Sequence, residues 1–163
     1  MEMRRIRGFT LVELLVVIAI ISILTVITVS QFETARKKAR DAQRKGDVGS
    51  VAKALQLYFA DYNVFPSANT VNGWLMTGGE FKDAADYVYM KVMPKETRPL
   101  FPPFCYKTDM EKKKFAVYAL LENTADSDCH YTGGSPSYGC EGQLYCFAVT
   151  SPNATLDGSG NLN

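Results

Sequence analysis

Residue types that carry much of enzyme chemistry are scarce in this 163-residue chain, which has one histidine, one tryptophan and four cysteines. The cysteines contain no CxxC pair, so their spacing disfavours a zinc site. His130 adjoins Cys129, but no orienting partner or nucleophile motif accompanies the two residues. There is also no phosphate-binding loop and no nucleophile elbow. These absences argue against an enzyme, and we assign no catalytic residue.

Net charge is also low, because 18 basic residues nearly balance 17 acidic ones. A chain with a formal charge of +1 is no obvious polyanion binder, so we predict no specific nucleic-acid partner. Hydrophobic residues make up 47% of the chain and charged residues 21%, which is typical of a globular protein and excludes a wholly disordered one.

One long apolar run stands apart from this ordinary composition. The stretch from Phe9 to Val29 reads FTLVELLVVIAIISILTVITV, and 16 of its 21 residues are apolar. As an α-helix it would span about 31 Å, which is close to the thickness of one hydrocarbon core. A conventional cleaved signal peptide is disfavoured, because the run is long, lacks a clean small-x-small site and contains Glu13. We therefore predict a membrane helix over residues 9–29, in which Glu13 needs a partner or a route to the interface.

The sequence RGFTLVELLVVIAIISIL follows a basic leader and resembles the class III leader of type IV pilins and type II secretion pseudopilins. The resemblance implies that residues 1–8 are a leader peptide, that a membrane-bound prepilin peptidase cleaves after Gly8, and that the new amine of Phe9 is methylated. It also implies a role for Glu13 in filament assembly. Physical chemistry agrees, because a cationic Phe9 amine paired with Glu13 of a neighbouring helix would lower the burial cost of both charges and fix the stagger between subunits.

The function implied by the resemblance is a structural subunit of a type IV pilus-like filament, which polymerises through its N-terminal helix after leader cleavage. Two alternatives stay open: the major pseudopilin of a type II secretion system, and a single-pass membrane-anchored extracytoplasmic binding domain. The expected partners are other copies of the chain, the prepilin peptidase, the inner-membrane assembly platform and, before assembly, the membrane itself. The precursor is expected in the inner (cytoplasmic) membrane with its head outside the cytoplasm, and the mature protein in an extracellular or periplasmic filament.

The apolar run continues into a helical pattern that contains no proline between Gln31 and Asn63. Apolar residues recur three and four positions apart and define one stripe, formed by Val48, Val51, Ala52, Leu55, Tyr58, Phe59 and Tyr62. We therefore predict one helix over residues 9–63, whose second half offers a face for a sheet to cover.

Six basic residues follow the apolar run: Arg36, Lys37, Lys38, Arg40, Arg44 and Lys45. A positive-inside count would place this side of the membrane in the cytoplasm, but the leader motif is more specific and we follow it. We interpret the stretch as a solvated helix that meets acidic surface on neighbouring subunits. Binding to nucleic acid or lipid headgroups is the less favoured alternative, because Asp41 and Asp47 intervene and no aromatic residue is interleaved.

Residues 64–163 are predicted to form a globular head of the α+β class. Three runs rich in aromatic and β-branched residues predict an antiparallel sheet packed on the long helix, at 104–109, 114–122 and 143–150. The connection from Ser67 to Pro103 contains a predicted short helix over Glu80–Val92. The tail from Asn153 onward is predicted to be a frayed end.

Cysteines without metal-site spacing favour disulfides in an oxidising, extracytoplasmic setting. Four cysteines allow three connectivities. We predict Cys129–Cys140, which would close a short glycine-rich loop, and Cys105–Cys146, provided that their Cα atoms come within about 7 Å.

An oxygen-rich stretch, ENTADSD, lies between the second and third predicted strands, with Glu122, Asn123, Asp126 and Asp128 as candidate calcium ligands. Major pseudopilins, which the chain resembles, carry a calcium-binding loop in this general region, although its ligands do not match residue by residue. The reading that we favour is a solvated polar loop. Apart from calcium, we predict no cofactor.

Overall fold

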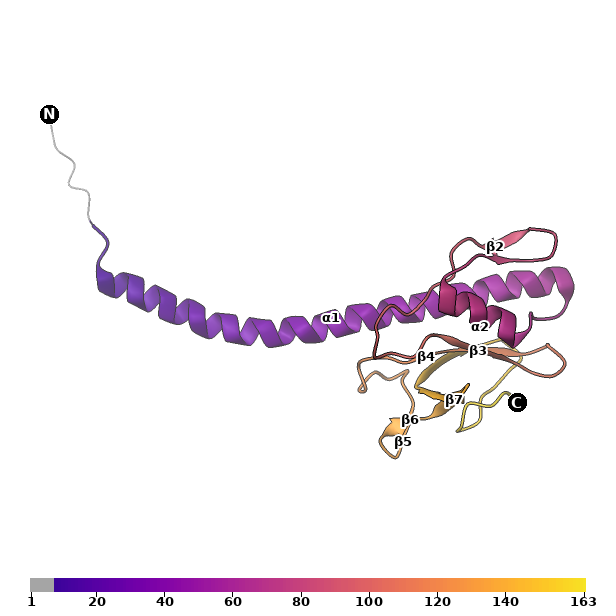
Figure 1. Cartoon of the computed structure of the whole chain (residues 1–163). Coiled ribbons are helices and arrows are strands. Elements are labelled where there is room, and N and C mark those ends of the chain that lie inside the picture. The colour runs from indigo at the N-terminus through magenta and orange to yellow at the C-terminus, as the bar shows by residue number, and fades with distance from the viewer. Residues whose placement is uncertain (1–7) are drawn as a thin grey trace. The chain divides into compact units, whose positions relative to one another are not determined.

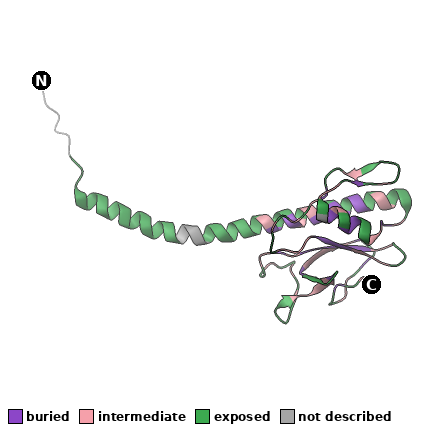
Figure 2. Ribbon diagram, viewed as in Figure 1, coloured by how far each residue is buried: buried purple, intermediate pink, exposed green. Residues whose placement is uncertain are grey.

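The computed structural model describes residues 8–163, with the side chains of all but residues 27–30 and 76. The described chain divides into two compact units, one ending at Lys38 and the other comprising Ala39–Asn163. The predicted long helix is confirmed as α1, Leu11–Tyr62 (Figure 1), which runs through both units. Its side chains up to Val26 are exposed, whereas its C-terminal half alternates buried and exposed residues (Figure 2).

The second unit has the predicted α+β class. Its central sheet is an antiparallel meander in the order β3-β4-β9. These strands are Cys105–Thr108, Phe115–Ala119 and Phe147–Thr150, close to the predicted runs. A second helix and three two-stranded sheets complete the unit: α2 Ala68–Thr77, β1 Phe81–Lys82, β2 Val88–Met90, β5 Tyr131–Thr132, β6 Ser135–Pro136, β7 Tyr138–Cys140 and β8 Gln143–Tyr145. The predicted third strand is thus two strands, β8 and β9, separated by Cys146.

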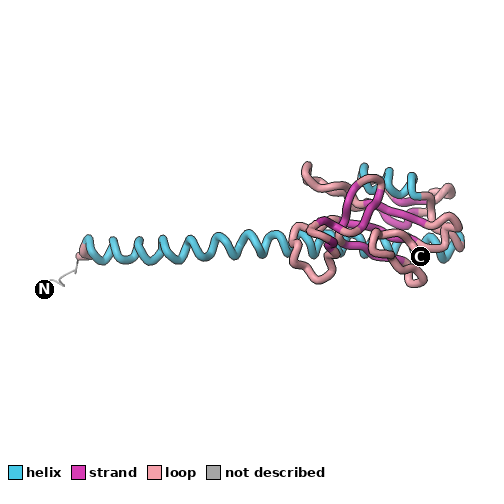
Figure 3. Tube along the Cα trace, turned by 90° about the horizontal axis from the view of Figure 1, so that it is seen from below, coloured by secondary structure: helices cyan, strands magenta, loops and turns pink. Residues whose placement is uncertain are grey.

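One face of the central sheet packs on the C-terminal half of α1, with α2 alongside β3 (Figures 1 and 3). The predicted helical stripe supplies this core, with Val48, Val51 and Leu55 fully buried. The opposing residues are those of β3 and β4 that point the same way, together with residues of α2 and its flanks: Phe65, Val71, Leu75, Phe81, Met93, Tyr106, Phe115 and Val117. This core forms because alternate residues of each strand face the helix.

The opposite face of the sheet is covered as well, so that β4 is buried on both faces. Tyr118 lies at the centre of this second cluster, and its hydroxyl donates a hydrogen bond to the carbonyl oxygen of Gly160 at 2.7 Å. Leu156 and Leu162 pair in an antiparallel bridge and pack against the cluster. The prediction of a frayed tail from Asn153 is therefore wrong, because apolar residues of the tail are needed to cover Tyr118.

The predicted helix over Glu80–Val92 is also wrong, since this segment forms the hairpin β1–β2. The apolar spacing was helical, but of the described side chains on that face only Phe81 is buried. Asp83 supplies the turn: its Oδ1 accepts hydrogen bonds from the backbone N–H groups of Ala85 (2.8 Å) and Tyr87 (2.9 Å). An aspartate that satisfies the backbone two and four residues ahead favours a turn over a helix.

The helix that the sequence pattern did not predict, α2, lies where a plain connection was expected. It ends at Gly78, which has a positive φ of 75° and donates its N–H to the carbonyl of Trp74. Buried Asn72 bonds to the backbone of Tyr106 on β3, with its Oδ1 accepting at 2.7 Å and its Nδ2 donating at 3.1 Å. An asparagine side chain thus takes the place of a neighbouring strand at the outer edge of β3.

Candidate functional site

The predicted processing junction lies just before α1. Residues 1–7 of the leader lie outside the described residues, whereas Gly8, Phe9 and Thr10 are described as exposed and non-helical. The Phe9 side chain is 76% exposed. A peptidase needs access to the backbone that it cleaves, and the exposed, non-helical residues 8–10 allow it. Cleavage there and methylation of Phe9 stay predictions.

Glu13 has a role in its own helix that the sequence analysis did not include. Its Oε2 accepts hydrogen bonds from the backbone N–H and the hydroxyl of Thr10, each at 2.8 Å. In return, the Glu13 N–H donates to the Thr10 hydroxyl oxygen at 3.3 Å. This reciprocal arrangement is a capping box, which satisfies backbone groups at the start of a helix. The spacing T-x-x-E in the printed sequence is the signal that could have predicted it.

Behind this cap, α1 carries a continuous apolar surface. Its large apolar side chains from Leu11 to Val26 are 45–77% exposed. The hydroxyls of Ser22 and Thr25 donate to the carbonyls of Ile18 and Ile21, each at 2.7 Å, so these polar groups are satisfied within the helix. The stretch is long and apolar enough to cross a membrane by length and composition. Exposed apolar surface on this scale indicates a membrane or a protein partner.

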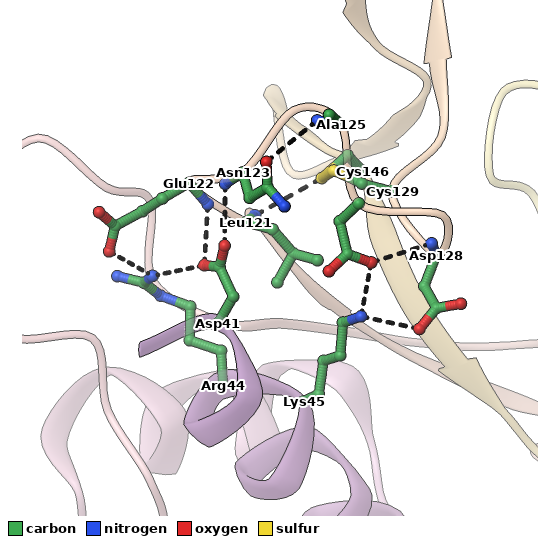
Figure 4. Close-up of a disulfide and its surroundings, with 11 residues drawn as sticks. Asp41, Arg44, Lys45, Leu121, Glu122, Asn123, Ala125, Asp128, Cys129 and Cys146 are labelled. Carbon is green, nitrogen blue, oxygen red and sulfur yellow. Dashed lines mark hydrogen bonds and ion pairs between the residues drawn. A yellow bond between two sulfur atoms is a disulfide. The ribbon is translucent and has the colours of Figure 1, made fainter. Parts of the chain in front are cut away.

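In the second unit, basic residues of α1 hold a loop of the head through ion pairs; we name this set the helix–loop clamp. It consists of Arg40, Asp41, Arg44 and Lys45 of α1 with Glu96, Arg98, Glu122, Asp126 and Asp128. Asp41, Arg44 and Lys45 of α1 reach up toward the loop in Figure 4. The expectation that these bases meet acids of neighbouring subunits is wrong for Arg40, Arg44 and Lys45, because the acids come from the same chain.

Glu122 is the centre of the clamp. Its carboxylate accepts hydrogen bonds from Nε and Nη2 of Arg40, each at 2.7 Å, and from Nη1 of Arg44 at 2.9 Å. It also forms an ion pair with Arg98. The Glu122 side chain is 5% exposed, so these charge-assisted bonds form away from bulk water. The hydrogen bonds from Arg40, followed by those from Arg44 and Arg98, hold the pKa of Glu122 well below its usual range.

Asp41 fixes the backbone of the same loop. Its side chain is almost fully buried and accepts the N–H groups of Glu122 and Asn123, each at 2.8 Å. It also bonds to Arg44 at 3.1 Å, one turn further along α1. The aromatic ring of Phe101 covers the Arg44 guanidinium at 4.6 Å from the ring centroid. Helix and loop are thereby joined by both side-chain and backbone contacts.

The four calcium candidates do not come together as one site. Glu122 binds the arginines, while Asp126 and Asp128 bind Nζ of Lys45 at 2.6 and 2.7 Å. The side chain of Asn123 accepts the N–H of Ala125 at 3.3 Å. Among the described residues, no group of three or more His, Cys, Asp or Glu side chains is placed to hold a metal ion. Calcium binding by this loop stays a prediction that the observed contacts do not support.

The disulfides join the clamp loop and its neighbour to the central sheet, but in a connectivity different from the predicted one. The bonds are Cys105–Cys140 and Cys129–Cys146, with Cα separations of 6.3 and 4.6 Å. Because β4 lies between β3 and β9, Cys105 and Cys146 are two strand spacings apart, about 9–10 Å, and cannot bond. Cys105 of β3 instead bonds Cys140 at the end of β7, and Cys146, between β8 and β9, bonds Cys129 of the loop, so the predicted Cys129–Cys140 bond does not form.

Comparison with known proteins identifies the family of the chain. The family described as the prokaryotic N-terminal methylation motif matches residues 3–29. The chain is also 32% identical over 136 residues to the type II secretion system core protein G of Pseudomonas aeruginosa, a match that covers 78% of this chain and 94% of that protein. The chain belongs to the type IV pilin and type II pseudopilin family. No solved structure gives a significant match.

Membership of the pilin and pseudopilin family accounts for the arrangement of the N-terminal residues. The matched motif contains Gly8, Phe9 and Glu13, the three positions singled out in the sequence. The motif and the exposed apolar part of α1 together fit a membrane-anchored precursor. The helix–loop clamp, by contrast, joins residues about 80 positions apart, so no local motif could have indicated it.

Proposed function

We propose that this member of the pilin family is the structural subunit of a type IV pilus-like filament, which polymerises through residues 9–29 after cleavage behind Gly8. The observation that carries the proposal is the apolar surface of α1 from Leu11 to Val26, whose large side chains are all exposed. A membrane covers that surface before assembly, and the same surface of other subunits covers it in a filament. The transfer replaces one apolar environment by another, so it exposes no apolar area to water.

The proposed route gives each expected partner a step. The precursor sits in the inner membrane with its head outside the cytoplasm, where disulfides such as Cys105–Cys140 and Cys129–Cys146 are stable. A prepilin peptidase removes residues 1–8 and methylates Phe9. An inner-membrane assembly platform then moves the mature chain into a homopolymer, in which Glu13 meets the Phe9 amine of a neighbour. The final location is extracellular or periplasmic.

A second candidate is the major pseudopilin of a type II secretion system. The specific support is the match to core protein G of such a system, which extends over nearly the whole of that protein. Both candidates use the same processing and the same helix, and they differ in what the filament does. Deleting the gene separates them: loss of surface fibres indicates a pilus subunit, and loss of exoprotein secretion with fibres intact indicates a pseudopilin.

The direct test of the proposal is the intact mass and N-terminal sequence of the mature protein. We expect a chain that starts at Phe9 and carries a methyl group on its amine. Gly8→Leu should leave an unprocessed, membrane-embedded precursor. Gly158→Leu is a matched control, because a Cβ at that exposed glycine meets no atom within 4 Å and processing should be normal. Retention of residues 1–8 in the wild type would instead favour a membrane-anchored binding domain.

A further inference from the structure

The structure separates the basic stretch of α1 into two sets of three. Arg40, Arg44 and Lys45 form the helix–loop clamp with acids of the head. Arg36, Lys37 and Lys38 are exposed, and the residues that the structure describes offer them no ion pair. One acid, Glu33, lies in the segment 31–38, which leaves that segment a net charge of +2. Three cations without an acidic partner among the described residues therefore lie between the apolar run and the head.

The position of these cations along the helix matches the headgroup layer of a membrane. At 1.5 Å per residue, residues 36–38 lie roughly 10–14 Å beyond Val29. A headgroup region is about 5–8 Å deep, and arginine and lysine side chains can reach back several ångströms toward it. Phe32 lies between the apolar run and the cations; it is 56% exposed, and the Arg36 guanidinium covers its ring at 4.4 Å from the centroid. An aromatic ring next to a cation suits the boundary between acyl chains and headgroups.

The distribution of the cations around the helix also favours lipid over a protein partner. Successive residues of an α-helix are rotated by about 100°, so Arg36, Lys37 and Lys38 point to three different sides. A docked protein would contact one side of the helix and leave at least one cation uncovered. Lipid headgroups surround a membrane helix and can meet all three.

We propose that Arg36, Lys37 and Lys38, with Phe32 beneath them, bind anionic phospholipid headgroups on the head side of the membrane and so hold the unassembled subunit at a fixed depth. The proposal rests on the proposed function in one respect, that residues 9–29 lie in a membrane before assembly. Its ligand is the phosphate of an anionic glycerophospholipid in the bilayer. The attraction falls with rising salt, because the site is exposed.

The test uses the full-length protein reconstituted in mixed phosphatidylcholine–phosphatidylglycerol vesicles. Spin-labelled lipid of each kind reports, by electron paramagnetic resonance, the fraction immobilised at the protein. We expect the wild type to prefer phosphatidylglycerol by roughly fivefold at low salt, with the preference lost at high salt. The triple variant R36Q/K37Q/K38Q should show no preference. Glutamine is a good helix former, so circular dichroism should show the same helix content.

A matched triple variant, K53Q/K91Q/K112Q, removes three exposed lysines of the second unit and should keep the wild-type preference. Equal association of both lipids with the wild type, or an unchanged preference in R36Q/K37Q/K38Q, would overturn the proposal. Zero-length cross-linking of Lys37 or Lys38 to a second copy, without lipid preference, would overturn it in favour of a contact between subunits. Flotation of the protein with washed vesicles is scored separately, because its failure would refute membrane anchoring itself.

Discussion

Glu122 lies on a loop and pairs with three arginines, Arg40 and Arg44 of α1 and Arg98 of the connection before β3. Removing its charge would leave the buried Arg44 and the half-exposed Arg40 beside a neutral side chain. We expect Glu122→Gln to lower the free energy of unfolding by about 3 kcal/mol, as is typical when one partner of a buried ion pair is removed. Urea denaturation of the head measures the change. Asp128→Asn is the matched control: Asp128 is 58% exposed and its pairing with Lys45 should contribute less than about 1 kcal/mol.

The lowered pKa of Glu122 predicts how the stability of the head depends on pH. A carboxyl group with a depressed pKa in the folded state stabilises the fold above its unfolded pKa of about 4.3, and this stabilisation is lost as the pH falls toward the folded value. The difference in stability between the wild type and Glu122→Gln should therefore be constant from pH 7 to about pH 5 and shrink below pH 4. A difference that instead vanished between pH 7 and 6 would show that another group controls the clamp.

Glu13 can act as a helix cap, as a charged partner of a neighbour's Phe9, or as both, and two substitutions separate these roles. Glutamine can form the capping box at the N3 position but carries no charge. Alanine carries no charge and cannot form the capping box. If the charge drives assembly, both Glu13→Gln and Glu13→Ala should be cleaved normally and fail to enter filaments. Sheared-filament yield measures this. Normal filaments from Glu13→Gln would show that the cap is the function of this side chain.

How much of the site could be predicted depended on whether its residues are near in sequence. Gly8, Phe9 and Glu13 form a local motif, and all three lie within residues 3–29, which match the N-terminal methylation family. Asp41 and Glu122 could not be paired in advance, because their contact depends on how the central sheet places the loop after β4. The basic stretch was predicted to meet acids of neighbouring subunits, but Arg40, Arg44 and Lys45 pair with acids of the same chain, because the fold of the head brings those acids to α1.

Among the elements, long periodic segments were predictable and short ones were not. The period of α1 extends over many turns, and the strands around β4 are rich in aromatic and β-branched residues. The segments α2 and β1–β2 are each too short for the spacing of their apolar residues to distinguish a helix from a strand. In both, a polar side chain makes contacts that the apolar pattern does not reveal: Asn72 binds the edge of β3, and Asp83 binds the backbone of the hairpin turn.

The disulfides are expected to contribute to the stability of the head by joining its elements. Cys129–Cys146 ties the clamp loop to the start of β9 across a separation of 17 residues, a closure that stabilises by about 3 kcal/mol in the chain-entropy model. The double variant C129S/C146S should lose roughly this free energy of unfolding. Non-reducing peptide mapping of the wild type checks the connectivity; a Cys129–Cys140 peptide would restore the pairing first predicted from the sequence.

At the scale of the whole molecule, the head needs the second half of α1 for its core. A fragment comprising residues 39–163 retains Val48, Val51 and Leu55 as well as the clamp, so we expect it to fold and to melt within about 3 °C of the full-length head. A fragment of residues 63–163 lacks this helix and should remain unfolded. Near-UV circular dichroism distinguishes the two. An unfolded 39–163 fragment would show that the apolar segment stabilises the head.

Because β4 is buried on both faces, we expect the head to unfold as a whole. β4 is hydrogen-bonded to β3 and β9, and its side chains belong to both hydrophobic clusters. Its amide hydrogens can exchange with deuterium only when both clusters open, so exchange at residues 116–119 should require global unfolding, while the exposed tip between β5 and β6 exchanges locally. A damaged head therefore has no stable half-open form: it is either intact, and protected from proteases, or fully open to them.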